Sequence, residues 1–336
     1  HGKTTTSSMM STVMLEKDPT IVVGGILPEI GSNAKPGKSK YFIAEADESD
    51  NSFLYMNPIY SIITNIEEDH LDTHGCLENI NKSFSQFMDQ TEKEVIVCID
   101  CENLKNVALG KNSDKIKTYS IKDKSADIYG GNIKVEDGKI NYDVYIKGEL
   151  VGNYTLSVPG NHNILNSLPV IYLAKKFGVE EDYLGKALTH FKGSKRRYDI
   201  LFNDKELGIK VIDDYAHHPT EIKATIENEK ITVIFQPHRY SRVKFLLNSF
   251  NDAFVGADEV IILPIYAAGE KDEFGVTVED LGKVLNNKKV TIEKNPEKVD
   301  EKVLNCPGHE VFMFMGAGDI SKIAHRIADK LEGKIR

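Results

Sequence analysis

Apolar and polar residues alternate along the first hundred residues in a pattern that predicts short strands separated by helices. Strands are expected at residues 20–23, 41–44, 59–64 and 95–99, and a helix from Thr4 to about residue 15. This order is typical of βαβ units, in which helices connect parallel strands. We therefore expect a parallel sheet in this part of the chain.

Between about residues 126 and 158 the pattern changes to strands of alternating polarity. Glycine-containing turns separate these strands, at Gly130-Gly131, Asp137-Gly138 and Lys147-Gly148. Short turns between strands of period two predict an antiparallel meander without a helix. We expect it to form a small antiparallel sheet, inserted into or appended to the parallel one.

The chain then returns to helices and buried strands. Pro159-Gly160 ends the meander, Asn161 is placed to cap a helix that reaches about residue 177, and another helix is expected at about 181–191. Beyond a basic link at 193–197, strands alternate with helices and are expected at 210–213, 232–236, 259–264, 290–293 and 311–315. This pattern predicts a second parallel α/β sheet.

The length of 336 residues predicts two domains at about 150 residues each. We place the boundary near Arg197, which gives domains of residues 1–196 and 197–336. The net charge of −9 gives no overall attraction to nucleic acid or to an anionic membrane, so a phosphate ligand needs a local basic site. No apolar run approaches the length of a membrane span, and we expect a cytoplasmic protein.

The cysteines do not predict a disulfide framework, because there are four of them in a long chain. Cys98 and Cys101 form a lone CxxC pair. A structural role is expected for them, since no second pair completes a zinc site.

The strongest local motif is Gly2-Lys3-Thr4, the end of a phosphate-binding loop. In such a loop backbone amides and the lysine hold the terminal phosphates, and the threonine hydroxyl binds Mg²⁺. An upstream glycine of the full pattern lies outside the sequence. The chain opens at His1 without a methionine or a preceding strand, and we expect it to be a piece of a longer protein.

Acidic residues follow two of the expected strands. Residues 45–50 (EADESD) come after one strand, and residues 64–72 (TNIEEDHLD) come after the next. Ligands of such sheets bind beyond the carboxyl ends of the strands, so these groups could hold a metal ion. A solvated acidic loop is the alternative for the first cluster. A zinc site at His70 and His74 is the alternative for the second, although further zinc ligands are missing nearby.

Three further loops carry candidate binding residues. His162 and Asn166 lie four residues apart on one helix face, where they are either a nucleoside contact or a polar helix start. Residues 212–219 (IDDYAHHP) and 235–242 (FQPHRYSR) each follow a strand, and their arginines suit a phosphate or carboxylate. For Gly316-Ala317-Gly318 a close-packed turn is favoured over a dinucleotide site.

These motifs together resemble the Mur ligase family over essentially the whole chain. The matching residues are 1–6, 18–20, 24–25, 45–50, 64–67 with Asp69 and His70, 160–163 with Asn166, Arg196-Arg197, 213–219 and 236–242. The resemblance implies a P-loop-type central ATPase domain followed by a Rossmann-like α/β domain. It also implies an N-terminal domain that binds a UDP-sugar, which is absent from this sequence.

The resemblance assigns roles to individual residues. Gly2 and Lys3 would contact the ATP phosphates, Arg197 would approach them, and His162 and Asn166 would contact the nucleoside. Thr4, Glu45 and His70 would hold Mg²⁺, and Lys3, Glu45, His70 and Arg197 would be the catalytic group. Tyr215, His218, Arg239 and Arg242 would shape the substrate side of the second domain.

Within the family the motifs are most similar to the member that joins L-alanine to UDP-N-acetylmuramate through an acyl phosphate, in peptidoglycan precursor synthesis. The related ligase that recycles murein tripeptide is the first alternative, and residues 236–242 favour the alanine-adding type. A P-loop phosphotransferase without ligase activity is the second alternative, and a fragment that only binds nucleotide is the third. Without the upstream loop and the UDP-binding domain, we expect the sequence as it stands to be inactive alone.

Overall fold

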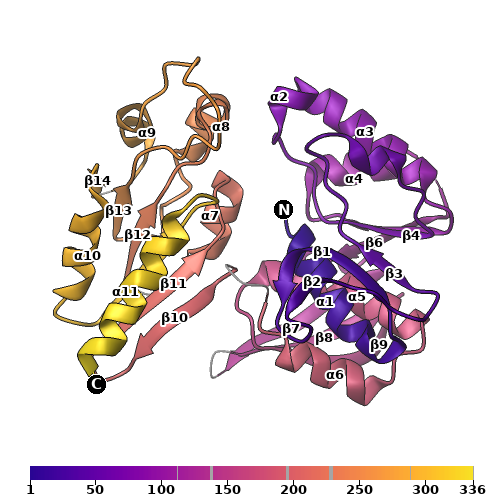
Figure 1. Ribbon diagram of the computed structural model, residues 1–336. Helices are drawn as coiled ribbons and strands as arrows, with labels where there is room; N and C mark the ends of the chain where they lie inside the picture. The colour runs from indigo at the N-terminus through magenta and orange to yellow at the C-terminus, as the bar shows by residue number, and fades with distance from the viewer. Residues whose placement is uncertain (112, 137–138, 194–196, 227–229, 288, 336) are drawn as a thin grey trace. The chain divides into compact units, whose positions relative to one another are not determined.

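The computed structural model describes residues 1–336 except 112, 137–138, 194–196, 227–229, 288 and 336. Over the described residues the chain divides into two compact units, His1–Lys195 and Arg196–Arg336 (Figure 1). The expected turn at Asp137-Gly138 and residues 194–196 of the basic link lie outside the described residues. Each unit has its own sheets and its own core.

The main sheet of the first unit is mixed. Its strands run in the order β4 (Tyr60–Ile63), β5 (Glu94–Cys98), β6 (Ile116–Ser120), β7 (Ile128–Glu136), β8 (Lys139–Ile146) and β9 (Glu149–Leu156). Strands β4 to β7 pair in parallel, whereas β7, β8 and β9 pair antiparallel. The expected antiparallel meander is therefore present, and it extends the parallel strands within one continuous sheet.

A separate small sheet in the first unit has the order β2-β1-β3. It contains β1 (Thr20–Leu27), β2 (Ser32–Lys35) and β3 (Phe42–Ala44). Strand β1 pairs in parallel with β3 and antiparallel with β2. The expectation of one parallel sheet for the first hundred residues was therefore wrong in its pairing, although the strands are present.

Helices surround these sheets in the first unit (Figure 1). They are α1 (Lys3–Met14), η1 (Leu15–Lys17), η2 (Ser52–Tyr55), α2 (Leu71–His74), α3 (Leu77–Gln90), α4 (Glu102–Leu109), α5 (Asn161–Lys176) and α6 (Glu181–His190). Helix α5 begins at Asn161 itself, and Gly160 occupies the N-cap position with φ of 93°. The expected capping role of Asn161 was therefore wrong.

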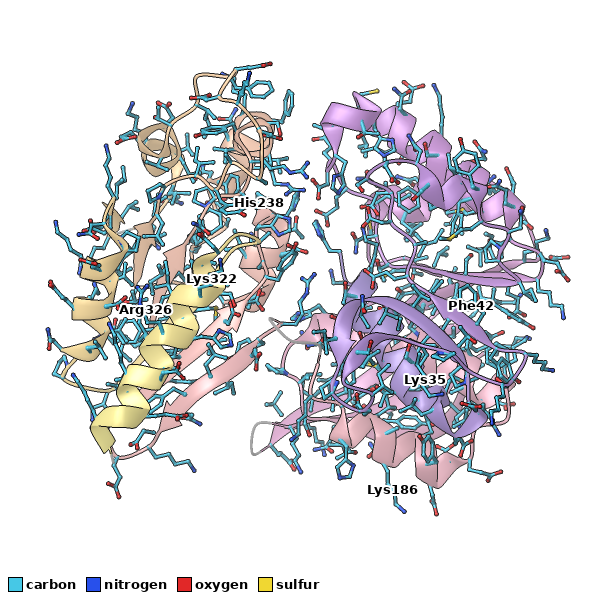
Figure 2. The ribbon with its side chains drawn as sticks, in the orientation of Figure 1. Lys35, Phe42, Lys186, His238, Lys322 and Arg326 are labelled. Carbon is cyan, nitrogen blue, oxygen red and sulfur yellow. The ribbon has the colours of Figure 1, made fainter. Side chains whose placement is uncertain are left out.

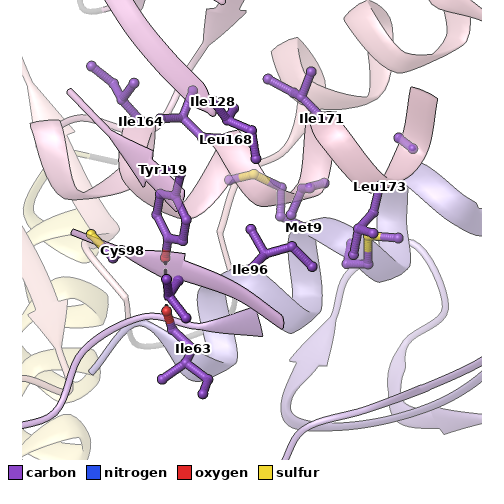
Figure 3. Close-up of a cluster of buried hydrophobic side chains, with 14 of the residues drawn as sticks. Met9, Ile63, Ile96, Cys98, Tyr119, Ile128, Ile164, Leu168, Ile171 and Leu173 are labelled. Atoms are coloured by element: carbon purple, nitrogen blue, oxygen red, sulfur yellow. Dashed lines mark hydrogen bonds between the residues drawn. The ribbon is translucent and has the colours of Figure 1, made fainter. Parts of the chain in front are cut away.

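The core of the first unit joins α1 and α5 to the main sheet. Met9 of α1, Ile96 of β5 and Leu168 of α5 are completely buried in it (Figure 3). The Tyr119 hydroxyl donates a 3.5 Å hydrogen bond to the carbonyl of Ile63. Burial raises the pKa of the Cys98 thiol to about 12, and Cys98 and Cys101 are free thiols. The packing of α1 fixes the position of its N-terminus relative to the strand ends.

The second unit contains a sheet that is parallel except at one edge. Its order is β10 (Asp199–Asp204), β11 (Ile209–Asp214), β15 (Glu310–Met315), β12 (Ile231–Phe235), β13 (Glu259–Ile262) and β14 (Val290–Ile292). Strand β10, which the sequence pattern did not predict, pairs antiparallel with β11. Strands β11 to β15 were expected and are present, and they pair in parallel.

Apolar layers cover both faces of this sheet. Val233 and Phe235 of β12 belong to one buried cluster, and Ile234 between them belongs to the other. This alternation places helices against both faces, as in doubly wound α/β folds. The helices are α7 (Pro219–Thr225), α8 (Tyr240–Leu246), η3 (Leu247–Phe250), α9 (Val278–Val284), α10 (Pro296–Leu304) and α11 (Ile320–Ile335). Over the described residues, no helix has the length and apolar character needed to cross a membrane.

Candidate functional site

The N-terminus of α1 lies at the ends of two strands in the first unit. The backbone carbonyl of His1 accepts hydrogen bonds from the Thr64 hydroxyl and from the Asn65 side-chain amide, the latter at 2.8 Å. Thr64 and Asn65 directly follow β4. Polar side chains at this strand end therefore hold the backbone that leads into α1.

Gly2 is the N-cap of α1 and has φ of 78°, in the left-handed region. A Cβ atom at this position would lie 2.6 Å from Oδ1 of Asn166, so a side chain here would be strained and also collide. Asn166 is buried, whereas His162 is exposed on the same helix. The structure therefore packs Asn166 against the loop backbone and does not bring the two expected nucleoside contacts onto one exposed face.

Glu45 directly follows β3 and accepts hydrogen bonds from both neighbouring elements. Thr4 of α1 donates its hydroxyl to Oε1 at 2.8 Å, and Ser7 donates its hydroxyl to Oε2 at 2.9 Å. The backbone N–H of Gly24 in β1 donates to Oε2 at 2.7 Å. The expected metal ligands Thr4 and Glu45 are thus in contact, in a set of oxygen donors that suits Mg²⁺.

Lys3 forms ion pairs with the acidic segment that follows β3. Its ammonium group lies 3.0 Å from Oδ2 of Asp47 and donates a hydrogen bond to Oε2 of Glu48. Burial works to lower the pKa of Lys3, but the charges of Glu48 and Asp47 outweigh it and raise the pKa above 10.5. Burial likewise works to raise the pKa of Asp47, and the charge of Lys3 and hydrogen bonds from Ser49 hold it at about 2. Lys3 and Asp47 are therefore both charged at neutral pH.

His70 lies beside Glu48 in this structure. Its Nε2 atom is 3.9 Å from Oε1 of Glu48 and 3.6 Å from Oδ2 of Asp69, and its backbone has φ of 53°. His74 is buried, and its Nε2 atom lies 2.9 Å from the carbonyl of Glu48. His70 therefore faces the acidic segment as expected, through Glu48. The hydrogen bond to the backbone gives His74 a structural role in holding this segment.

Sequence reasoning missed the contributions of Ser7, Gly24 and Glu48. Ser7 lies three residues after Thr4, so a helix places both hydroxyls on one face. This spacing could have predicted that Ser7 lies at the site. Glu48 was part of the expected acidic cluster, but its pairing with Lys3 depends on the loop conformation. The approach of Gly24 to Glu45 depends on the pairing of β1 with β3.

In the second unit, aromatic and imidazole rings form a row at the carboxyl ends of β11, β12 and β13. Tyr215 and His217 are 5.2 Å apart between ring centroids, and His217 and His238 are 5.6 Å apart. The ring of His238, which is labelled in Figure 2, stacks on the Tyr266 ring with 5.6 Å between centroids and an interplanar angle of 13°. The Arg197 guanidinium lies 4.9 Å from the centroid of the Tyr215 ring. The loops after these strands therefore carry aromatic rings, and the cationic Arg197 side chain lies against one of them.

The expected substrate residues of the second unit lie in this region with different exposure. The Arg239 backbone has φ of 66°, and its N–H donates to the carbonyl of Tyr266 at 2.8 Å. Nη1 of Arg242 is 3.5 Å from Nδ1 of His238. His218 is buried, and its Nδ1 accepts a 3.3 Å hydrogen bond from the N–H of Thr220 as the cap of α7. The His217 ring is therefore part of the row of aromatic and imidazole rings, whereas His218 caps α7.

Asp214, at the end of β11, is buried beneath these loops. It accepts hydrogen bonds of 2.7 Å from the N–H groups of Tyr198 and Ala216. Burial raises the pKa of the Asp214 carboxyl to about 6, against the opposing charge of Arg197 and the two hydrogen bonds. Asp214 therefore fixes the backbone directly after Arg197 and directly after Tyr215.

The glycines after β15 form a close-packed turn. A Cβ atom at Gly318 would lie 2.5 Å from Oε1 of Gln236, and one at Gly316 would lie 2.7 Å from the Gln236 carbonyl. The Gln236 side chain also accepts from the N–H of Ile320 and donates to Asp319. The prediction of a packed turn here is confirmed.

Comparison with known families explains this combination of units. The Mur ligase middle domain matches residues 1–174, and the Mur ligase glutamate ligase domain matches residues 196–318. The chain belongs to the Mur ligase family. This confirms the family resemblance and the α/β fold expected from the sequence motifs.

Individual relatives are similar over almost the whole chain. The UDP-N-acetylmuramate–L-alanine ligase of Fusobacterium nucleatum is 59% identical, over 99% of this chain and 74% of that protein. The ligase of the same name from Pelotomaculum thermopropionicum is 41% identical, with the same coverage of both chains. The crystal structure of the UDP-N-acetylmuramate-alanine ligase of Thermotoga maritima has a TM-score of 0.79 and 32% identity, over 99% of this chain and 74% of that chain.

A more distant neighbour shares the fold. The MurF ligase of Thermotoga maritima, solved in complex with ADP, has a TM-score of 0.75 at 16% identity and covers 99% of this chain. At this identity the likeness concerns the fold alone.

Proposed function

We propose that the protein is an ATP-dependent ligase that joins L-alanine to UDP-N-acetylmuramate in peptidoglycan precursor synthesis. The observation that carries the proposal is the arrangement at the start of α1. A lysine ammonium, a threonine hydroxyl and the Glu45 carboxylate lie at one helix N-terminus, in a chain 59% identical to a ligase of that name. A helix N-terminus favours a bound phosphate, because its free N–H groups and its dipole face the anion.

The residues of the first unit suit a magnesium nucleotide. Thr4 and Glu45 would hold the cation with oxygen donors, and His70 is the third expected ligand. When bound, Mg²⁺ neutralises charge on the phosphate oxygens. On nucleotide binding, the Lys3 ammonium would leave Asp47 and Glu48 and contact the terminal phosphates. Gly2 would bring its backbone close to these phosphates, because it has no side chain. His162 and Asn166 are proposed nucleoside contacts.

The chemistry follows from the weakness of a carboxylate as an electrophile. The lactyl carboxylate of UDP-N-acetylmuramate attacks the γ-phosphorus of ATP, which gives an acyl phosphate and ADP. Lys3 would stabilise the charge on the transferring phosphoryl group, and Arg197 is proposed to approach the same group and to stabilise it as well. The amine of L-alanine then attacks the acyl carbon and loses a proton, and phosphate leaves as the amide forms.

The second unit carries guanidinium groups that are suited to binding an anionic substrate. Arg239 and Arg242 are proposed to bind phosphate or carboxylate oxygens, since guanidinium groups match both. Tyr215 and His218 are proposed to shape the same region, His218 through the start of α7. The sequence around His238 favours L-alanine over a murein tripeptide as the second substrate.

The proposal is tested with the full-length protein by omitting each substrate in turn. Phosphate, ADP and amide product are measured with Mg²⁺ and ATP, with and without L-alanine and UDP-N-acetylmuramate. We expect phosphate release to require both substrates and to equal the amide formed. Phosphate release that needs neither substrate would favour a simple phosphotransferase, and ligation of tripeptide in place of L-alanine would favour the recycling type.

A further inference from the structure

The two oxygens of the Glu45 carboxylate have different partners. Oε1 receives the Thr4 hydroxyl at 2.8 Å, whereas Oε2 receives the Ser7 hydroxyl at 2.9 Å and the Gly24 N–H at 2.7 Å. The Ser7 hydroxyl also lies 3.2 Å from the carbonyl of Thr4. A hydroxyl has one proton, and the nearer, charged carboxylate oxygen is the stronger acceptor. Oε2 is therefore held from the helix and from the strand at once.

Gly24 permits this arrangement because it has no side chain. A Cβ atom there would lie 2.7 Å from Oε1 and 2.9 Å from Oε2 of Glu45, closer than real Cβ atoms approach other atoms. Glycine is needed here for close approach of the strand to the carboxylate. The N–H of Gly24 can reach Oε2 only because the carboxylate sits against the bare backbone.

The Glu45 carboxylate has partners of a different kind from those of its acidic neighbours. Asp47 and Glu48 are paired with the ammonium of Lys3. Within the described part of the chain, the donors to Glu45 are two hydroxyls and an amide, all of them neutral. Neutral donors thus orient the Glu45 carboxylate, and it forms no ion pair among the described residues, which suits a ligand for a cation.

We propose that Ser7 is a positioning residue for the metal ligand Glu45. Together with the Gly24 N–H it fixes Oε2, so that Oε1 and the Thr4 hydroxyl are presented side by side to a divalent cation. The terminal torsion of a glutamate is otherwise soft, and outer hydrogen bonds that fix it typically change metal affinity by about 10- to 100-fold. This inference rests on the proposed function, in which a magnesium nucleotide binds at α1.

The helix offers a matched control for Ser7. Ser11, one turn further along α1, is buried and donates its hydroxyl to the backbone carbonyl of Ser7 at 2.7 Å. Ser11→Ala therefore removes a hydroxyl from the same helix without touching Glu45. Ser7→Thr keeps the hydroxyl, and Ser7→Cys keeps the size with a weaker donor.

The experiment measures metal binding directly. Calorimetry gives the affinity for ADP as a function of Mg²⁺ concentration, and electron paramagnetic resonance gives the binding of Mn²⁺ in the presence of ADP. We expect Ser7→Ala to need about tenfold more metal for half-saturation. ADP binding without metal should be unchanged, Ser7→Thr should restore the wild-type value, Ser7→Cys should lie between, and Ser11→Ala should resemble wild type.

Two results would overturn the inference, and they differ in what they say of the proposed function. If wild-type ADP binding depends on metal and Ser7→Ala and Ser7→Cys show the same dependence, Ser7 does not position the ligand, and the proposed function stands. If wild-type ADP binding is indifferent to metal, both the inference and the proposed magnesium site are wrong. Thermal unfolding of each variant checks that the helix is intact.

Discussion

The carboxylate of Glu48 binds the ammonium group of Lys3, the residue proposed to hold the ATP phosphates. The same ammonium group lies 3.0 Å from Oδ2 of Asp47. The lysine is thereby kept charged and held at the start of α1, where an arriving phosphate would replace the carboxylates. The geometry links nucleotide binding to the position of the acidic segment after β3.

Lys3→Ala in the full-length protein should abolish ligation and leave the fold intact. The Lys3 side chain is 27% exposed and lies outside the apolar core, so its loss removes the phosphate contact without opening a cavity. We expect the rate of amide formation to fall by at least about 100-fold, with little change in the melting temperature. Lys3→Arg is the matched control for charge. Near-normal turnover of the alanine variant would contradict the assignment.

Glu45→Ala and His70→Ala should each raise the Mg²⁺ concentration needed for activity. Each removes a proposed ligand, and the effect should be larger for Glu45, which already contacts Thr4 in this structure. The measurement is the rate of ligation by the full-length protein against Mg²⁺ concentration at saturating ATP. A magnesium dependence equal to wild type in both variants would show that these strand ends do not form the metal site.

Arg239→Ala and Arg242→Ala should weaken the use of UDP-N-acetylmuramate more than the binding of ATP. Both arginines belong to the second unit, and the proposed phosphate loop belongs to the first. The KM of the full-length protein for each substrate separates the two effects. Lys244→Ala removes an exposed cation from the same helix as Arg242 and should change neither. An equal loss of ATP affinity would argue against this division of roles.

Asp214→Asn should change how stability depends on pH. The pKa of Asp214 is about 6 in the folded protein against an ordinary 3.8, so the folded state keeps a proton that the unfolded chain has lost. This stability is fully present below pH 3.8 and is lost as the pH rises to about 6.

The free energy of unfolding of wild type, relative to the asparagine variant, should therefore fall by about 2 kcal/mol between pH 4.5 and pH 7. Urea unfolding of both proteins at the two pH values measures this difference. A difference that does not vary with pH would mean that Asp214 titrates normally in the folded state.

Local patterns predicted most elements because burial on a sheet or helix has a fixed period. The strands at 232–236 and 311–315 and the helix from Thr4 were found from such periods and agree with β12, β15 and α1 within about two residues. Strand pairing was harder. The split of β1 and β3 from the main sheet and the antiparallel edge strand β10 depend on contacts between distant segments.

The candidate site shows the same limit. The sequence placed Thr4 and Glu45 in one site, and the structure brings them within hydrogen-bonding distance. It could not show that Asn166 is buried while His162 is exposed, because their spacing fits one helix face in either case. Nor could it show which histidine of the pair at 217 and 218 caps α7, since that depends on the turn before the helix.

The proposed reaction requires ATP to activate a carboxylate for amide formation, and this activation moves an oxygen atom that can be followed with an isotope. UDP-N-acetylmuramate labelled with ¹⁸O at both oxygens of its lactyl carboxylate is incubated with ATP, Mg²⁺, L-alanine and the full-length protein, and the products are analysed by mass spectrometry. An acyl phosphate passes one carboxylate oxygen to phosphorus, so each phosphate released should carry one ¹⁸O and each amide should retain the other. Amide formed with unlabelled phosphate, or phosphate released without amide, would rule out an acyl phosphate on the path to the product.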